Sequence, residues 1–290
     1  MTEVAQMNDY SQYPLSDRIY TGSEEKVGIT IDNQYFIVKF QKNSETGLLN
    51  NHLSEHLGSS IFNLIGEEAQ KTTLGTFRGK AVVLCKDFNN SREIFVPFNG
   101  VGESTLERDK EMYTYSYEDI ILMLQDNSKL TNVQETIEKF WNMYIIDALI
   151  GNFDRHGSNW GFLKSGNSYR LAPIFDNGSS LFPRRNTEEL MSEVITNKTL
   201  LDDMTFKYPT SQIRINNKKS SYFEIIHSLQ FEECNKALKR MYLKIDINKI
   251  CQFIDTEDEL TNTQKMFYKH ILKYRYEHII KKSYLILMEG

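Results

Sequence analysis

The sequence DRHGSN at residues 154–159, followed seventeen residues after Asn159 by DNG at 176–178, determines how this 290-residue chain is interpreted. An ATP-dependent phosphoryl-transfer site requires two carboxylates and an amide. The two motifs supply a carboxylate, an amide five positions later, and a second carboxylate ahead of a glycine. Asp154 would orient an acceptor hydroxyl, while Asn159 and Asp176 would hold Mg²⁺ against the phosphates. The alternative is an ordinary polar loop, because Asp, Asn, Gly and Ser are common turn formers.

The two motifs are placed by the elements predicted around them. An apolar helix, with Thr131 as the predicted N-cap and Gln134 at the capping-box position, leads into the first motif. Strands Trp160–Leu163 and Tyr169–Ile174 then form a hairpin, and the second motif follows its second strand. Both motifs are therefore expected on one side of the hairpin, where the two carboxylates would repel each other unless a divalent cation lay among them.

The N-terminal part of the chain predicts a small sheet with one helix. Two hairpins are expected, one turning at residues 32–33 and the other at 78–79, and the helix is expected over Gly47–Ile65. Lys39 lies in the apolar strand Gln34–Gln41, where a buried lysine is costly unless it is paired. Glu55, sixteen residues later, is the natural partner if Lys39 contacts phosphates. The alternatives are a lysine facing solvent on an edge strand and a solvated glutamate.

The segment before the first strand is a weak candidate for a phosphate-binding loop. Backbone amides around Gly22 can cover phosphates, with Lys26 adding charge. The segment lacks the GK[ST] ending of a P-loop, and this absence argues against a Walker-type NTPase. His156 has no second histidine at metal-ligand spacing, so we expect it to bond within its loop or to contact the transferred phosphate.

Composition narrows the class of protein. A net charge of −5 argues against nucleic-acid binding through bulk electrostatics, so no direct nucleic-acid contact is expected. Three cysteines without ligand spacing indicate reduced packing thiols and a cytoplasmic setting. The N-terminus has no apolar signal region, and the most apolar stretch, Phe140–Gly151, contains Asp147 and is too short to span a bilayer. Delivery to a host, or export without a cleaved signal, is left open.

The pattern changes from strands to helices near residue 90. We predict an α+β protein with two lobes in one domain: residues 1–88 as a small β-rich N-lobe and residues 89–290 as a mainly helical C-lobe. The further helical stretches expected in the second lobe are Glu118–Gln125, Thr187–Val194, Tyr222–Lys244, Asn248–Phe253 and Asn262–Leu287.

These residues resemble the HipA-like serine/threonine kinases, and in particular their short CtkA-like branch. The matching runs lie within about residues 20 to 185: 22–26, 35–40, 54–57 leading to 65–66, 82–88, 147–163 and 172–183. The resemblance implies the bilobal protein-kinase-like fold shared with phosphatidylinositol kinases, with a catalytic β-hairpin in the C-lobe. It also implies transfer of phosphate from ATP with Mg²⁺ to a serine or threonine of a protein, the chain itself included.

The resemblance also implies a role for each candidate residue. Asp154 would be the catalytic base, and Asn159 and Asp176 would bind Mg²⁺. The remaining residues would contact ATP: Lys39 with its ion-pair partner Glu55, Gly22 and Ser23 in the phosphate loop, Lys86 within the adenine-contacting hinge 84–88, and His156.

The same resemblance also bears on the partners of the protein and on alternative functions. A small antitoxin-like partner is implied, although full-length HipA toxins carry an N-terminal subdomain where this chain has about twenty residues before Gly22. A toxin, an effector and a regulator are the alternative biological roles. The string DRHxxN also resembles the catalytic loop of phosphatidylinositol kinases, so a lipid substrate is an alternative. A nucleotide-binding pseudokinase and a metal-dependent phosphohydrolase are two more.

Overall fold

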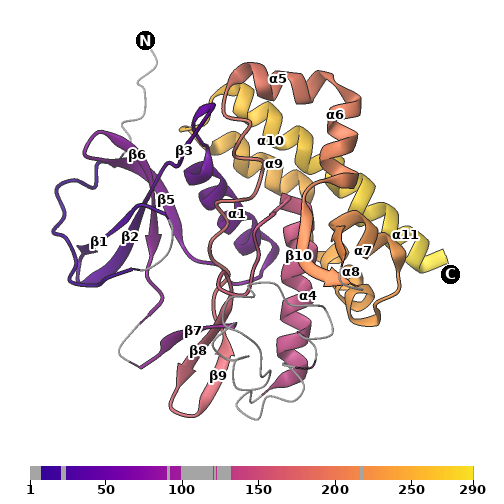
Figure 1. The fold of residues 1–290 in the computed structure, drawn as a ribbon, viewed down its shortest axis with the longest axis horizontal. Helices are drawn as coiled ribbons and strands as arrows, with labels where there is room; N and C mark the ends of the chain where they lie inside the picture. Colours follow the sequence, from indigo (N-terminus) through magenta and orange to yellow (C-terminus); the bar gives the residue numbers. More distant parts are fainter. Residues whose placement is uncertain are drawn as a thin grey trace.

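The computed structural model describes residues 8–20, 24–89, 92–98, 120, 122, 132–215 and 218–289. Within these residues a small antiparallel sheet lies beside a larger helical part, and helix α1 lies between them (Figure 1). The predicted α+β architecture is therefore confirmed. Of the predicted helix Glu118–Gln125, only residues 120 and 122 belong to the described residues.

The main sheet has the strand order β1-β2-β6-β5. Its strands are β1 (Lys26–Ile31), β2 (Gln34–Phe40), β5 (Thr72–Phe77) and β6 (Lys80–Lys86). Asp32 and Asn33 turn the first hairpin with φ of 48° and 59°, and Arg78 and Gly79 turn the second with φ of 51° and 74°. Two successive residues of positive φ match the right-handed twist of the strands, so both predicted two-residue turns form. Two short strands, β3 (Asn43–Ser44) and β4 (Gly47–Leu48), follow β2.

Side-chain alternation along β2 places Lys39 on the face of the sheet that α1 covers. Val38 and Phe40 point to the other face, into a small cluster that also contains Tyr10 and Ile29. Val83, the register partner of Lys39 on β6, belongs instead to the main core. The lysine is therefore forced into the protein interior by the pleat of its strand.

Helix α1 spans Asn51–Ile65 and ends at Gly66, whose φ of 91° gives a left-handed C-cap. The prediction Gly47–Ile65 was wrong at the start, because residues 47–48 pair in β4. Twelve of its fifteen residues are buried, including the polar residues His52, Ser54 and Glu55. Burial on several sides is expected for a helix that packs between a sheet and a helical bundle.

Burial of His52 predicts a loss of stability in acid. Burial lowers the pKa of His52 from 6.5 to about 4, so between these pH values the unfolded chain binds a proton that the folded chain does not. Stability should therefore fall as pH drops from 7 to 5, with His52 contributing about 2 kcal/mol of that loss. Urea unfolding at both pH values should show a smaller loss for His52→Gln. An equal loss in both proteins would contradict the prediction.

The helical part contains α4, which crosses its centre, and a set of shorter elements around it (Figure 1). They are α4 (Val133–Ile150), α5 (Glu188–Thr196), α6 (Lys198–Asp202), a π-helical turn (Asp203–Lys207), β10 (Thr210–Ile215), β11 (Lys218–Ser221), α7 (Tyr222–Ser228), α8 (Glu232–Lys244), α9 (Ile247–Thr256), α10 (Asn262–Arg275), a π-helical stretch (Tyr276–Lys281) and α11 (Lys282–Glu289).

Two sequence predictions in the helical part were wrong. The N-cap of α4 is Asn132, which accepts a hydrogen bond from the backbone N–H of Glu135, so the capping pair lies one residue after the predicted Thr131 and Gln134. The predicted helix Tyr222–Lys244 is two helices, because Leu229 adopts a left-handed φ of 55° between them. The apolar periodicity continues across this break, which is why periodicity alone did not detect it.

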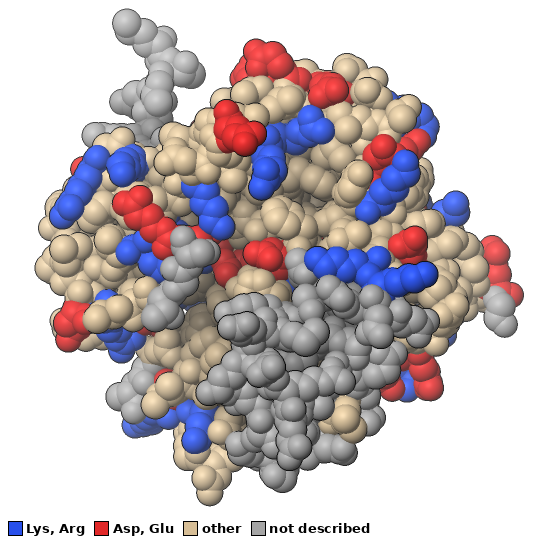
Figure 2. Space-filling view, viewed as in Figure 1, with Lys and Arg blue, Asp and Glu red and all other residues tan. Residues whose placement is uncertain are grey.

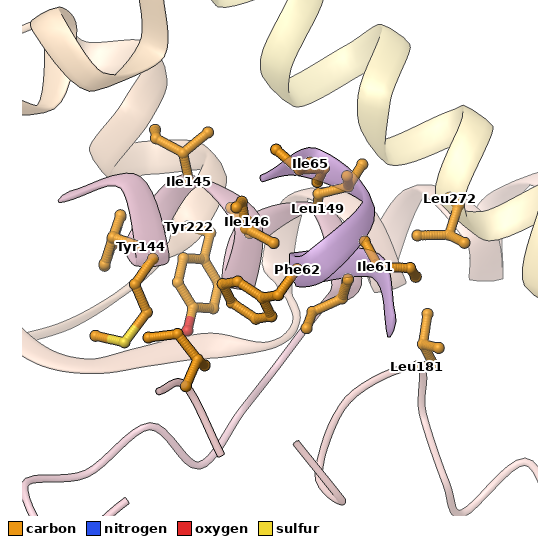
Figure 3. Packing of buried hydrophobic residues seen from close by; sticks show 14 of the residues in the cluster. Ile61, Phe62, Ile65, Tyr144, Ile145, Ile146, Leu149, Leu181, Tyr222 and Leu272 are labelled. Carbon is orange, nitrogen blue, oxygen red and sulfur yellow. The ribbon is translucent and has the colours of Figure 1, made fainter. Parts of the chain in front are cut away.

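The main hydrophobic core joins the sheet, α1 and the helical part. Ile61 and Phe62 of α1 pack against Ile146 and Leu149 of α4, and Leu272 of α10 lies beside them (Figure 3). Because the same cluster also includes Val83 and Cys85 from β6, it is continuous from sheet to helices. All three cysteines are unpaired and buried. None of the described helices combines the length and the apolar character that a bilayer span requires.

A second antiparallel sheet contains the hairpin that lies between the two acidic motifs. Strands β8 (Gly161–Ser165) and β9 (Ser168–Leu171) form the predicted hairpin, and β7 (Ile94–Pro97) adds a strand that the sequence analysis missed. Each end of the hairpin leads to one of the two acidic motifs, at residues 154–159 and 176–178.

Candidate active site

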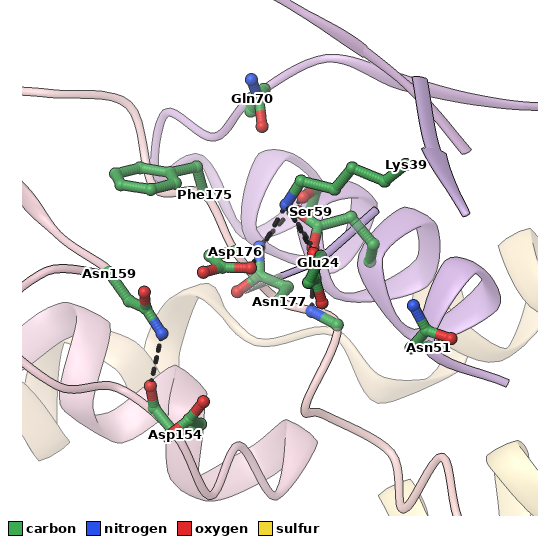
Figure 4. Close-up of polar contacts among 12 residues, drawn as sticks. Glu24, Lys39, Asn51, Ser59, Gln70, Asp154, Asn159, Phe175, Asp176 and Asn177 are labelled. Atoms are coloured by element: carbon green, nitrogen blue, oxygen red, sulfur yellow. Dashed lines mark hydrogen bonds and ion pairs between the residues drawn. The ribbon is translucent and has the colours of Figure 1, made fainter. Parts of the chain in front are cut away.

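Lys39 meets two carboxylates that reach it from different parts of the chain (Figure 4). Its Nζ lies 3.1 Å from Oε2 of Glu55 on α1 and 3.2 Å from Oδ1 of Asp176, which follows β9. Lys39 is 6% exposed and Glu55 is 1% exposed. The sheet, α1 and the segment after the hairpin therefore converge on one buried ion-pair cluster, formed by Lys39, Glu55 and Asp176.

The cluster keeps its lysine charged. Burial alone would lower the pKa of Lys39, but the carboxylates of Asp176 and Glu55 raise it well above its ordinary value. Burial likewise opposes ionisation of Asp176, yet Lys39 and Arg155 outweigh it and lower the pKa of this carboxyl. A permanent cation and an ionised carboxylate are thus held together in a region of low dielectric. In such a region their electrostatic interactions with a charged ligand are strong.

The DNG turn is held in an uncommon backbone conformation. Asp176 has a φ of 59°, a region that residues other than glycine rarely occupy. Two residues later, the backbone N–H of Gly178 donates to Glu55 Oε2 at 2.9 Å. Such conformations cost about 1–3 kcal/mol each and cluster at functional sites. The turn therefore aims the Asp176 carboxylate at Lys39 while α1 holds the turn in place.

The loop 154–159 begins where α4 ends. Gly151 closes the helix with a φ of 64°, and the side chain of Asn152 accepts a hydrogen bond from the Asp154 N–H at 3.0 Å. Asn159 donates its side-chain N–H to the backbone oxygen of Asp154 at 2.7 Å, which closes the loop (Figure 4). His156 accepts at Nδ1 from the Ser158 N–H at 3.2 Å, so it bonds within the loop.

The Asp154 side chain combines partial burial with access to solvent. Burial raises its pKa above the usual range, the charge of Asp176 adds to this effect, and His156, 4.0 Å away, opposes it. Its side chain is 40% exposed. Asp154 is therefore close enough to Asp176 to interact electrostatically, and open enough to reach an incoming hydroxyl.

Arg155 connects the two acidic motifs, a role that the sequence analysis missed. It is 7% exposed and binds Asp147 of α4 through two bonds, from Nε at 2.9 Å and from Nη2 at 3.0 Å. It also donates to the backbone oxygen of Asn159 at 3.0 Å and to the side chain of Asn177 at 2.6 Å. The one available signal was Asp147 itself, because an acid inside an apolar helix requires a cationic partner.

Asn177 extends this connection to α1. Its side-chain nitrogen donates to the Ser59 hydroxyl at 2.9 Å, and Asn177 itself is fully buried. A methyl group at Gly58 would lie 2.7 Å from the Asn177 side chain, closer than packed atoms come. Glycine in the interior of a helix is normally unfavourable, but at position 58 it provides the space for this contact.

Removing the Arg155 side chain should destabilise the protein strongly. In Arg155→Met the Asp147 carboxylate stays 1% exposed without its cation, which should lower the free energy of unfolding by about 3–5 kcal/mol. Denaturant unfolding measures this loss. Arg185→Met is the matched control, because Arg185 pairs with the exposed Glu193 at 3.1 Å and should cost less than about 1 kcal/mol. Equal losses in the two variants would contradict the assigned role.

Of the remaining candidates, Gly22 and Ser23 fall outside the described residues. Glu24, the next residue in the sequence, lies 3.9 Å from Lys39 Nζ and 2.8 Å from Lys42 Nζ. Lys86 is the last residue of β6, and its backbone oxygen accepts a hydrogen bond from the Gln70 side chain at 3.0 Å.

Three aromatic rings lie between the end of β6 and Asp176, and only one of them, Phe88 at the end of the predicted hinge 84–88, was selected by the sequence analysis. Phe88, Phe95 and Phe175 form a triangle with centroid separations of 5.8, 5.5 and 5.1 Å. Such edge and tilted contacts stabilise an aromatic cluster. Phe175 is adjacent to Asp176, so the cluster supports the acidic turn from the side of the hairpin strands.

The donor atoms suit Mg²⁺ shared with phosphates. Among the described residues no three His, Cys, Asp or Glu side chains gather into a metal cage. Mg²⁺ commonly takes only one or two carboxylates and completes its shell with phosphates and water. Asp176 supplies a carboxylate. Asn159 uses its amide nitrogen on Asp154, so its amide oxygen is left for a cation.

The charges on the visible face are mixed. Figure 2 shows lysine and arginine side chains interspersed with aspartate and glutamate over this face. Such a distribution favours solubility rather than steering toward one polyanion.

Comparison with known proteins gives a family match and a close relative. The family model of the HipA-like C-terminal domain matches residues 19–255. The serine/threonine-protein kinase CtkA of Helicobacter pylori is 32% identical over 271 residues, covering 91% of this chain and 83% of the relative.

Solved structures agree with this match. The crystal structure of the proinflammatory kinase CtkA from Helicobacter pylori superposes with a TM-score of 0.90 at 30% identity, covering 98% of this chain and 99% of the other. HipA from Shewanella oneidensis MR-1, solved with HipB and operator DNA, has a TM-score of 0.61 at 14% identity, covering 96% of this chain and 70% of the other. The second likeness shows a shared fold only.

Proposed function

Because this chain belongs to the HipA-like kinase family and is a serine/threonine protein kinase, we propose that it transfers the γ-phosphoryl group of ATP through the site built on Lys39, Asp154 and Asp176. The observation that carries the assignment is the position of Lys39 Nζ, 3.1 Å from Glu55 and 3.2 Å from Asp176, together with the electrostatic interaction between Asp176 and Asp154. Residues 1–88 and 89–290 act as the two lobes around it.

The reaction follows from these positions. Asp154 orients the hydroxyl of a serine or threonine and takes its proton as the oxygen attacks the γ-phosphorus. The new O–P bond forms in line with the breaking bond to the β-phosphate oxygen, and ADP leaves. Lys39 offsets negative charge on the phosphates, and Glu55 fixes its position. A Mg²⁺ ion held by Asn159 and Asp176 would neutralise further charge on the phosphate oxygens.

Other residues complete nucleotide binding in this proposal. Gly22 and Ser23 cover the phosphates, His156 contacts the transferred group, and Lys86 contributes to the hinge that contacts adenine. The supporting observation for the hinge is its anchoring: the Asp87 N–H donates to the Tyr35 oxygen at 2.9 Å, so the segment is fixed to β2. We also propose that the chain phosphorylates itself, and that a small antitoxin-like protein is its partner.

The test is phosphate transfer from labelled ATP with Mg²⁺ to a generic protein substrate and to the chain itself, with mapping of the modified residues. We expect label on serine or threonine. Label in phosphoinositide vesicles but in no protein would support a lipid kinase instead. Phosphate release without an acceptor would indicate a hydrolase, and ATP binding without turnover a pseudokinase. Each of these three results would overturn the proposal.

A further inference from the structure

Glu24 brings a third carboxylate to the ion-pair cluster of Lys39, Glu55 and Asp176 (Figure 4). Its Oε2 lies 3.9 Å from Lys39 Nζ, and its Oε1 lies 2.8 Å from Lys42 Nζ. The Glu24 side chain is 10% exposed, so its charge is largely shielded from water and acts strongly on other charges nearby. In the proposed function the phosphates of ATP bind at Lys39, and they therefore meet this carboxylate.

The direction of the Glu24 side chain is set by the pairing of β1 with β2. Lys26 is the register partner of Lys39, so both side chains point to the face of the sheet that α1 covers. The Phe40 N–H donates to the Glu25 oxygen at 3.2 Å, which extends the pairing to the residue before β1. Side-chain alternation then places Glu24 on the same face as Lys26 and Glu25 on the opposite face, where the Glu25 side chain is 68% exposed.

The lysines of this site are balanced by carboxylates of the protein itself. Three lysines and three carboxylates interact there: Lys26, Lys39 and Lys42, with Glu24, Glu55 and Asp176. The pKa of Lys26 reflects these contacts, because burial and the charge of Lys39 lower it while the carboxylates oppose this effect. ATP stays anionic when it binds Mg²⁺, so its phosphates add negative charge to a site whose lysines already have partners.

Among these three carboxylates, Glu24 is the one that opposes the phosphates. Glu55 is fixed on α1, where it also accepts the Gly178 N–H at 2.9 Å. Asp176 would bind Mg²⁺, and the charge of the ion would offset its own. Glu24 is held by lysines, which are the groups that attract phosphate oxygens. A phosphate and the Glu24 carboxylate are therefore alternative partners of the same cation.

We propose that Glu24 is a specificity-determining residue that sets how tightly the site binds a nucleotide and in which charge state. Its carboxylate competes with the phosphates for Lys39 and repels them, while Lys42 keeps it in the site. Both effects grow with the negative charge of the ligand. The site therefore favours ATP with Mg²⁺ over metal-free ATP. This inference rests on the proposed function, because it concerns the same phosphates.

The first experiment measures binding and needs no catalysis. Calorimetry gives the dissociation constants of adenosine, AMP, ADP and ATP, each with Mg²⁺, for the wild type and for Glu24→Gln. ATP should bind roughly fivefold to tenfold more tightly to Glu24→Gln, ADP should gain less, and adenosine should bind equally because it carries no phosphate. With a chelator in place of Mg²⁺, the gain for ATP should be larger. Equal or weaker binding of ATP to Glu24→Gln would overturn the proposal, as would an equal gain for adenosine.

Two further variants separate the charge from other effects of the substitution. Glu25→Gln removes the same group from the adjacent, exposed position and should bind ATP as the wild type does. Glu24→Asp keeps the negative charge and should bind ATP within about twofold of the wild type. Thermal unfolding should show that all three variants fold, since Lys42, which loses its partner in Glu24→Gln, is 39% exposed. If Glu24→Asp bound ATP as tightly as Glu24→Gln, side-chain length rather than charge would be responsible, and the proposal would fail.

The kinase reaction distinguishes this proposal from the proposed function. Glu24→Gln should lower the KM for ATP without raising kcat, because tighter phosphate binding also slows the release of ADP. A wild type that binds ATP but transfers no phosphate would overturn the proposed function and leave the role of Glu24 in binding intact. An active kinase whose affinity for ATP is unchanged in Glu24→Gln would overturn the role of Glu24 alone.

Discussion

Asp154→Asn is expected to lower the rate of phosphate transfer by roughly 10²–10⁴-fold, the range that a general base contributes. Asparagine keeps the size and can still accept a hydrogen bond, but it cannot take the proton of the attacking hydroxyl. Since the Asp154 side chain is 40% exposed and the contacts that close the loop involve its backbone, the fold should persist. Initial rates with labelled ATP and a protein substrate measure the effect.

Two further measurements test this assignment. Asp203→Asn, which removes a surface ion pair with Lys207 of 2.7 Å, is the control and should leave the rate unchanged. Burial raises the pKa of Asp154, and the base must be deprotonated, so activity should be lost as pH falls through a value above that of a free aspartate. Wild-type rates in Asp154→Asn would show that another group receives the proton.

Lys39→Met is expected to reduce activity by roughly 10²–10³-fold, comparable to removing one preorganised electrostatic contact to a transition state. It should also lower the free energy of unfolding by about 3–5 kcal/mol, because Glu55 and Asp176 would stay together without their cation. Rate measurements and denaturant unfolding give the two numbers separately.

The matched control for Lys39 is Lys42→Met. Lys42 is 39% exposed and pairs with Glu24 at 2.8 Å, so its loss should cost less than about 1 kcal/mol. A double variant, Lys39→Met with Glu55→Gln, should recover part of the lost stability because it removes one of the uncompensated carboxylates. If Lys39→Met were as stable as the wild type, the cluster would not be the buried network described above.

Much of the sheet was predictable because its signals are local. The hairpin of Thr72–Phe77 and Lys80–Lys86 turns at residues 78–79 as predicted, since two-residue turns with positive φ define the strand ends. Strand β7 was missed because it pairs with β8, more than sixty residues later, and its own sequence carries no turn signal. The break at Leu229 was missed for the opposite reason, because periodicity continued through it.

The candidate site was predictable in its charged residues but not in the residues that support them. Lys39, Glu55 and Asp176 stand out because charges in apolar segments require partners. Arg155 and Asn177 did not stand out, because both sit in polar loops where such residues are common. Their importance depends on the distance between two loops, and this distance is set by α1, Gly58 and the packing of α4.

The continuous core has a consequence for how nucleotide enters and leaves. Val83 and Cys85 of β6, with α1, share one hydrophobic cluster with α4, so a rigid swing of the whole sheet away from the helices would expose that cluster to water. The side of β1 and β2 that faces away from α1 packs into a separate and smaller cluster, with Ile29, Val38 and Tyr10. Lifting only the tip of the β1–β2 hairpin would cost far less buried area, because Ile31 is half-buried and Asp32, Asn33 and Gln34 are exposed. Exchange of ADP for ATP should therefore proceed by movement of this tip, with Lys39 and α1 staying in place.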